Sequence, residues 1–156
     1  MTDLDYDDEK VDQEWQSAMR VEVESYLANQ GVAHGAIGDV AAWHVAPLVS
    51  IWAIESLKVP DSVGWWAISG DLPTDYVSAA TIKHPRGALR AICNRWADMA
   101  SHMRRGISHP TISMGAPESW PELAELLQAR VELLREFAAT DEAWDYDESE
   151  FEGARK

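Results

Sequence analysis

The amino-acid sequence predicts an α+β fold, in which a small antiparallel sheet of two to three strands is packed by three main helices. Two observations support this prediction. Three segments carry apolar residues at the three-to-four spacing of amphipathic helices, and two short segments between the first and second of them are rich in β-branched and aromatic residues. A chain of 156 residues is long enough to bury a core without disulfide bonds.

Each predicted helix has a recognisable end signal. The helices are expected over 11–30, 85–105 and 120–139. Gly31 closes the first helix, and Pro85 begins the second with a backbone torsion already suited to a helix. Ser119 and Glu122 have the spacing of a capping box, in which the hydroxyl accepts from the amide of Glu122 and the carboxylate reaches back. The sequence therefore predicts both where these helices lie and where they stop.

The strands are expected over 48–56 and 63–69, with 76–82 as a candidate third. The turn residues of 58–62 between the first two predict a hairpin. A helix from Trp43 through Trp52 is the alternative for the first strand, although Pro47 counts against it. In the preceding segment, Asp39 is expected to cap one short helix that ends before Pro47.

Charge is unevenly distributed along the chain. The sequence holds 27 acidic and 13 basic side chains, a formal net charge of −14. Residues 1–30 carry nine acidic and two basic side chains, and residues 83–105 carry one acidic and six basic side chains. Phosphate contacts need Lys and Arg, so nucleic acid is not an expected partner. We expect a flexible acidic N-terminus over 1–10, a single globular domain over 11–140 and an acidic aromatic tail over 141–156.

The first ten residues lack a basic and apolar leader pattern, and no apolar run is long enough to cross a bilayer. The single cysteine, Cys93, excludes an internal disulfide bond and falls on the apolar stripe of the second predicted helix. A cytoplasmic protein without a membrane partner is expected, with Cys93 as a buried and unreactive thiol.

No short motif of known catalytic chemistry is present. The chain lacks the GxSxG, P-loop and GxGxxG patterns. The histidines show neither the HxxxH nor the HExxH spacing of a metal site; they are His34, His44, His84, His102 and His109. The sequence therefore predicts no catalytic residue, no metal ligand and no cofactor, and it favours a protein that is not an enzyme.

A binding pocket is one interpretation of residues 63–76, which combine adjacent tryptophans with two carboxylates and a tyrosine. The candidate pocket residues are Glu55, Trp65, Trp66, Asp71, Asp75 and Tyr76. Successive residues of a strand point to opposite faces, so at least one of the two tryptophans is expected in the core. Asp71 has a structural alternative, because an aspartate beside Pro73 often caps a turn by accepting from nearby amides.

Three segments resemble a family of short bacterial proteins known as a domain of unknown function. They are Val-Gly-Trp-Trp-Ala-Ile-Ser-Gly-Asp-Leu-Pro-Thr-Asp-Tyr at 63–76, His-Pro-Arg-Gly-Ala-Leu-Arg-Ala-Ile at 84–92 and Glu-Ser-Trp-Pro-Glu-Leu at 118–123. The resemblance covers roughly Glu14 to Trp144. It implies family membership and brings no catalytic residues. In size and acidity the chain is similar in kind to immunity proteins, which is an analogy without matching residues.

Two functions are compatible with these features. The first is a non-enzymatic interaction protein that binds and neutralises a basic protein partner, an immunity protein or antitoxin in its sharpest form. Its predicted contact residues alternate charge with aromatic rings; they are Trp144, Asp145, Tyr146, Asp147, Glu148, Glu150, Phe151 and Glu152. The second is a small-molecule-binding domain or enzyme with its pocket at residues 63–76.

Overall fold

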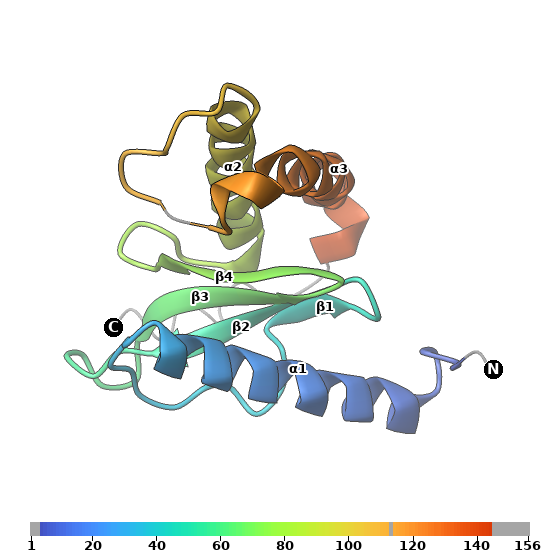
Figure 1. Ribbon diagram of the computed structural model, residues 1–156. Coiled ribbons are helices and arrows are strands. Elements are labelled where there is room, and N and C mark those ends of the chain that lie inside the picture. The colour runs from blue at the N-terminus through green and yellow to red at the C-terminus, as the bar shows by residue number, and fades with distance from the viewer. Residues whose placement is uncertain (1–3, 113, 145–156) are drawn as a thin grey trace. The chain divides into compact units, whose positions relative to one another are not determined.

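The computed structural model describes residues 4–112 and 114–144. It contains three α-helices and one four-stranded antiparallel sheet, so the predicted α+β class is confirmed (Figure 1). The elements run α1 (Glu9–Asn29), β1 (Trp43–Val45), β2 (Val49–Glu55), β3 (Val63–Gly70), β4 (Leu72–Ser78), α2 (Pro85–Arg104) and α3 (Trp120–Ala139). The chain forms two compact units: unit 1 extends to Ala88, and unit 2 begins at Leu89.

The sheet of unit 1 follows chain order, β1-β2-β3-β4, with every neighbouring pair antiparallel. Ile51 of β2 lies opposite Ile68 of β3, which in turn lies opposite Asp75 of β4. The β2–β3 turn is closed by Ser56, whose hydroxyl accepts from the amides of Lys58 and Val59 at 3.1 and 3.2 Å. The hairpin predicted from the turn residues 58–62 is therefore present.

The prediction of two to three strands was wrong, because the sheet has four. Residues 43–45 form β1, where a short helix before Pro47 was expected; Trp43 pairs with Ile51 of β2 across this edge. The last strand begins at Leu72 and ends at Ser78, earlier than the expected 76–82. Pro73 belongs to β4, an edge strand, where the amide hydrogen that proline lacks is not needed on the outer side.

One face of the sheet packs against α1 (Figure 1). Asp8 caps this helix by accepting from the amides of Lys10 and Val11 at 2.9 and 3.2 Å. The buried core of the interface comprises Val23, Leu27, Ile37, Trp52, Ile54 and Ala67. Each of the larger aliphatic side chains contributes about 1.5–3 kcal/mol by leaving water. The predicted first helix thus exists and holds the sheet through its apolar stripe.

In unit 2, the two helices present apolar stripes at helical spacing. Leu89, Ile92, Trp96, Met99 and Met103 are buried along α2, and Ala124, Leu127, Val131 and Leu134 along α3. Their polar flanks are joined by hydrogen bonds from Arg104 to Gln128 (3.4 Å) and from Arg135 to Asn94 (3.5 Å). The second and third predicted helices are both present.

The predicted capping box at the start of α3 was wrong. A single 3₁₀ turn, Pro117–Ser119, runs directly into the helix, and Ser119 has helical torsions of −92° and −6°. A capping serine needs extended torsions to aim its hydroxyl at the first free amides. The Ser119 side chain accordingly makes no capping hydrogen bond.

None of the helices in the described part of the chain combines the length and the apolar character that a membrane span requires.

Candidate functional site

The alternation of β3 and β4 separates the residues of the predicted pocket. Trp65 and Tyr76 pack at the margin of the core on the face that α1 covers. Trp66 and Asp75 belong to the opposite face and are 1% and 0% exposed. The Trp66 indole N–H donates to the carbonyl oxygen of Ile82 over 3.0 Å, as a structural tryptophan would. Asp75 accepts from the amide of Tyr76 at 2.8 Å.

The other two residues of that predicted pocket lie at the ends of strands. Asp71 is the exposed single residue between β3 and β4, and its amide donates to the carbonyl oxygen of Leu48 over 3.0 Å. Glu55 ends β2 and borders a separate open hollow with Asp39 and Asp61. A Cβ atom at Gly35 would meet the Glu55 carboxylate at 2.8 Å, so this glycine admits the side chain. The six side chains are thus not gathered at one point.

The predicted contact residues of the C-terminal tail begin at Trp144. This side chain is only 7% exposed, and its indole N–H donates to the carbonyl oxygen of Phe137 over 2.9 Å. It closes the end of α3 through a short 3₁₀ helix, Asp141–Trp144. Asp145, Tyr146, Asp147, Glu148, Glu150, Phe151 and Glu152 lie outside the described residues. Trp144 is therefore part of the folded unit and not a presented anchor.

An acidic surface with exposed apolar side chains lies on α1 and the loop beside it. Glu14, Glu22 and Glu24 are exposed on the helix around Val21, which is 61% exposed. Glu14 and Val21 are seven positions apart, two turns of the helix, so both lie on one side of it. From the loop, exposed Asp39 and Val40 border a groove of about 240 Å³ with Gln13, Gln16 and Ser17 of α1. We call the six residues Glu14, Val21, Glu22, Glu24, Asp39 and Val40 the α1 surface.

Three side chains of α1 form hydrogen bonds with the loop that follows the helix and with β1. Arg20 donates from Nε to the carbonyl oxygen of Gly38 (2.9 Å) and from Nη2 to that of Ile37 (3.0 Å). Gln16 accepts from the amide of Ala41 at 3.0 Å. Asp12 contacts Nε2 of His44 on β1 at 2.8 Å. The loop that contributes Asp39 and Val40 is thereby fixed against the helix.

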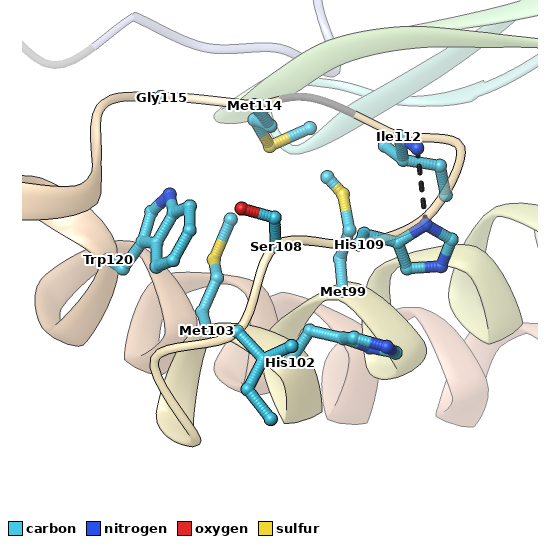
Figure 2. A pocket seen from close by; sticks show the side chains of 10 residues that line it. Met99, His102, Met103, Ser108, His109, Ile112, Met114, Gly115 and Trp120 are labelled. Carbon is cyan, nitrogen blue, oxygen red and sulfur yellow. Dashed lines mark hydrogen bonds between the residues drawn. The ribbon is translucent and has the colours of Figure 1, made fainter.

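Unit 2 contains a cavity of about 120 Å³ between α2, the loop after it and the start of α3 (Figure 2). Its walls combine apolar side chains with polar groups, a combination that is common for ligand sites. They comprise Met99, His102, Met103, Ile107, Ser108, His109, Ile112, Met114, Gly115 and Trp120. The indole N–H of Trp120 is buried and has no hydrogen-bond acceptor among the described residues.

Two histidines and a carboxylate gather beside this cavity. Ligand atoms of Asp98, His102 and His109 all lie within 4.8 Å of one another. The amides of Thr111 and Ile112 both donate to Nδ1 of His109, at 3.1 Å each, so the ring proton belongs on Nε2. That N–H faces Oδ2 of Asp98 at 2.6 Å. His109 therefore fastens its own loop to α2.

The hydrogen bond from His109 holds the pKa of the exposed Asp98 carboxyl below its ordinary value of 3.8. Burial raises the pKa of the Cys93 thiol from 9.0 to about 11, opposed weakly by the charge of Arg135. Sequence reasoning missed the grouping of Asp98, His102 and His109 because it searched for two histidines on one helix. An aspartate four residues before a histidine, as in Asp98 and His102, was the available signal.

The fold and its surfaces define a small acidic α+β protein. It belongs to the family described as Domain of unknown function (DUF4826), whose model matches residues 9–144. The resemblance seen in the three sequence segments is thus confirmed over nearly the same range. No curated protein and no solved structure matched the chain.

Proposed function

We propose that this protein is a non-enzymatic interaction protein of the cytoplasm, which binds and neutralises a basic protein partner as an immunity protein or antitoxin does. The α1 surface is the observation that carries the proposal. It combines four exposed carboxylates with two exposed valines, Val21 and Val40, which are 61% and 67% exposed. Acidic groups accelerate the approach of a basic partner, and apolar side chains supply contact area once the two proteins meet.

The rigidity of this surface supports the same function. Main-chain carbonyls of Ile37 and Gly38 are bound by Arg20, so the loop loses little freedom when a partner covers it. Ordering a mobile loop would cost binding energy, and a preorganised loop avoids that cost. The one arginine of α1, Arg20, is directed at this loop, so the exposed side of the helix carries its glutamates with a single basic residue, Lys10, in the first turn.

The surface of α3 provides a comparison. Glu125, Glu132 and Glu136 are exposed there, but Arg130 and Arg135 lie among them. Interspersed charges of both signs produce a weak field and are typical of a solvated surface. The two helices therefore offer matched sets of three glutamates, one proposed to bind and one not.

The test is capture of partners by the tagged protein from its source cells, followed by native mass spectrometry and measurement of association rates with the captured partner. Glu14→Gln/Glu22→Gln/Glu24→Gln should slow association by about tenfold or more and flatten its salt dependence. Glu125→Gln/Glu132→Gln/Glu136→Gln removes the same charge and should change little. Equal effects of both triple variants, or no stoichiometric basic protein at low salt, would contradict the proposal.

The contribution of the C-terminal tail needs a truncation that spares the fold. Trp144 is buried and its indole N–H is hydrogen-bonded to the carbonyl oxygen of Phe137, so the chain should be truncated after Trp144. If the acidic tail adds long-range attraction, the chain ending at Trp144 should bind the partner more slowly and with weaker salt dependence. Unchanged capture by this truncated chain would exclude the tail as a contact and leave the α1 surface to account for binding.

A further inference from the structure

The walls of the unit 2 cavity gather soft sulfur atoms. Three of the five methionines of the chain line it: Met99, Met103 and Met114. Met99 and Met103 are one turn apart on α2 and are 2% and 7% exposed, and Met114 comes from the loop opposite. Figure 2 shows the three thioether sulfurs directed into the same hollow from different sides, with the hydroxyl of Ser108 among them.

We propose that this cavity binds a monovalent copper ion, Cu(I), through the sulfurs of Met99, Met103 and Met114. Thioether sulfur is a soft and uncharged donor, and such ligands select Cu(I) over the harder divalent ions. A thioether has no proton to lose, so a buried methionine is ready to bind metal without titrating. Cu(I) is d¹⁰ and is satisfied by three soft donors.

Trp120 adds a second wall suited to a cation. Its indole ring borders the cavity, and its N–H is buried without an acceptor among the described residues. A buried donor without a partner costs about 1–3 kcal/mol, so hydrogen bonding does not explain the position of the ring. An indole face attracts a cation within about 6 Å, most strongly where water is excluded. Because the indole of Trp120 borders the cavity, we include it in the proposed site as a wall that attracts a cation.

The neighbouring group of Asp98, His102 and His109 is less suited to a divalent ion in this conformation. Nδ1 of His109 accepts from two main-chain amides, which leaves the proton on Nε2, the nitrogen facing Asp98. A neutral imidazole bound to metal through Nε2 carries its proton on Nδ1, where those two amide hydrogens already lie. A divalent ion would have to break both hydrogen bonds, whereas Cu(I) among the sulfurs leaves them in place.

The test is a titration of the full-length protein with Cu(I) under anaerobic reducing conditions, using the chromophoric chelator bicinchoninate as competitor. All variants carry Cys93→Ala, because a thiol also binds Cu(I). One equivalent should be withdrawn from the chelator. Loss of an outer-shell partner alone costs about 10–100-fold in metal affinity, so removing a direct ligand by Met99→Leu, Met103→Leu or Met114→Leu should cost at least about tenfold. Leucine conserves volume and keeps the wall packed.

Met19→Leu is the matched control, because it makes the same chemical change in unit 1 at the margin of the α1 core. It should retain the affinity of the Cys93→Ala parent. We expect Cu(I) to quench tryptophan fluorescence, and Trp120→Phe should weaken binding and reduce that quenching. Circular dichroism of every variant distinguishes loss of ligands from loss of fold. Failure of the Cys93→Ala protein to compete with the chelator, or equal affinity in all four methionine variants, would overturn the proposal. Zn²⁺ binding that is lost in His109→Gln, with no Cu(I) binding, would do the same.

Discussion

Gly70 ends β3 in a conformation that a side chain does not tolerate. Its φ is +146°, and a Cβ atom there would lie 2.3 Å from the carbonyl oxygen of Leu48. That oxygen also accepts from the amide of Asp71, so it cannot move away without losing a hydrogen bond. The glycine therefore permits the direct turn from β3 into β4.

We expect Gly70→Ala to lower the free energy of unfolding by at least about 2 kcal/mol, through backbone strain and the clash together. Gly31→Ala is the control: Gly31 has φ of +70° and no atom within 4 Å of its added Cβ. It should cost about 1 kcal/mol from strain alone. Urea unfolding measures both, and equal losses would show that the contact with Leu48 has no effect.

Cys93 is 1% exposed, and burial raises the pKa of its thiol to about 11. In the unfolded chain the thiol ionises near 9, so between pH 9 and 11 only the unfolded state releases this proton. The contribution of Cys93 to stability is fully present below pH 9 and is lost as the pH rises toward 11. Urea unfolding from pH 8 to 11 should show that decline, and Cys93→Ala should reduce it. A decline of the same size in the variant would contradict this assignment.

At the scale of elements, a buried hydroxyl network joins β2, β3 and α1. The indole N–H of Trp52 donates to Oγ of Ser50 over 2.9 Å, and Ser50 donates to the carbonyl oxygen of Ser69 over 3.0 Å. Ser69 in turn donates to the carbonyl oxygen of Met19 on α1 over 3.4 Å. Both serines are 0% exposed, so no water replaces a missing partner.

Ser50→Ala should reduce stability by about 1–3 kcal/mol, because the Trp52 N–H would remain buried without an acceptor. Trp52→Phe removes the donor together with ring contacts. The double variant should lose less than the sum of the two single losses, since the unpaired donor arises only when Trp52 is retained. Thermal unfolding of the four proteins in this cycle checks the coupling, and strict additivity would contradict it.

The helices could be predicted from sequence, and two of the strands could not. Apolar residues at helical spacing identified α1, α2 and α3 to within a few residues because a helix satisfies its own backbone. A three-residue strand such as β1 exists only because β2 offers it hydrogen bonds, and its own residues carry little signal. Gly70, Asp71 and Pro73 indicated a turn in the sequence. A strand can nevertheless include Pro73, because β4 lies at the edge of the sheet, where one side of the strand needs no amide hydrogen.

The site was harder to predict than the fold. Trp65 and Trp66 are adjacent in sequence and were both predicted to line one pocket, yet alternation along β3 directs them to opposite faces of the sheet. The unit 2 cavity combines residues of α2 with a loop that begins after Gly106 and with Trp120. Within α2, four-residue spacing related Met99 to Met103, but nothing local related either to Met114. Only the folded loop brings them together.

At the scale of the whole molecule, a formal net charge of −14 opposes compaction through mutual repulsion. Raising ionic strength from 0.01 to 0.15 M shortens the screening length from about 30 to about 8 Å. We therefore expect the midpoint of thermal unfolding to rise with NaCl over this range. The variant Glu14→Gln/Glu22→Gln/Glu24→Gln should show a smaller rise, because three of the repelling charges are gone. An unchanged or falling midpoint would contradict this expectation.

The two edges of the unit 1 sheet bear on how the protein behaves at high concentration. An open strand edge is a template on which another chain can add a strand, which is how many sheets begin to form fibrils. Here β1 offers only three residues, and β4 carries Pro73, which lacks an amide hydrogen. The short strand β1 and the proline of β4, at opposite edges, are thus the features that discourage self-association of the sheet.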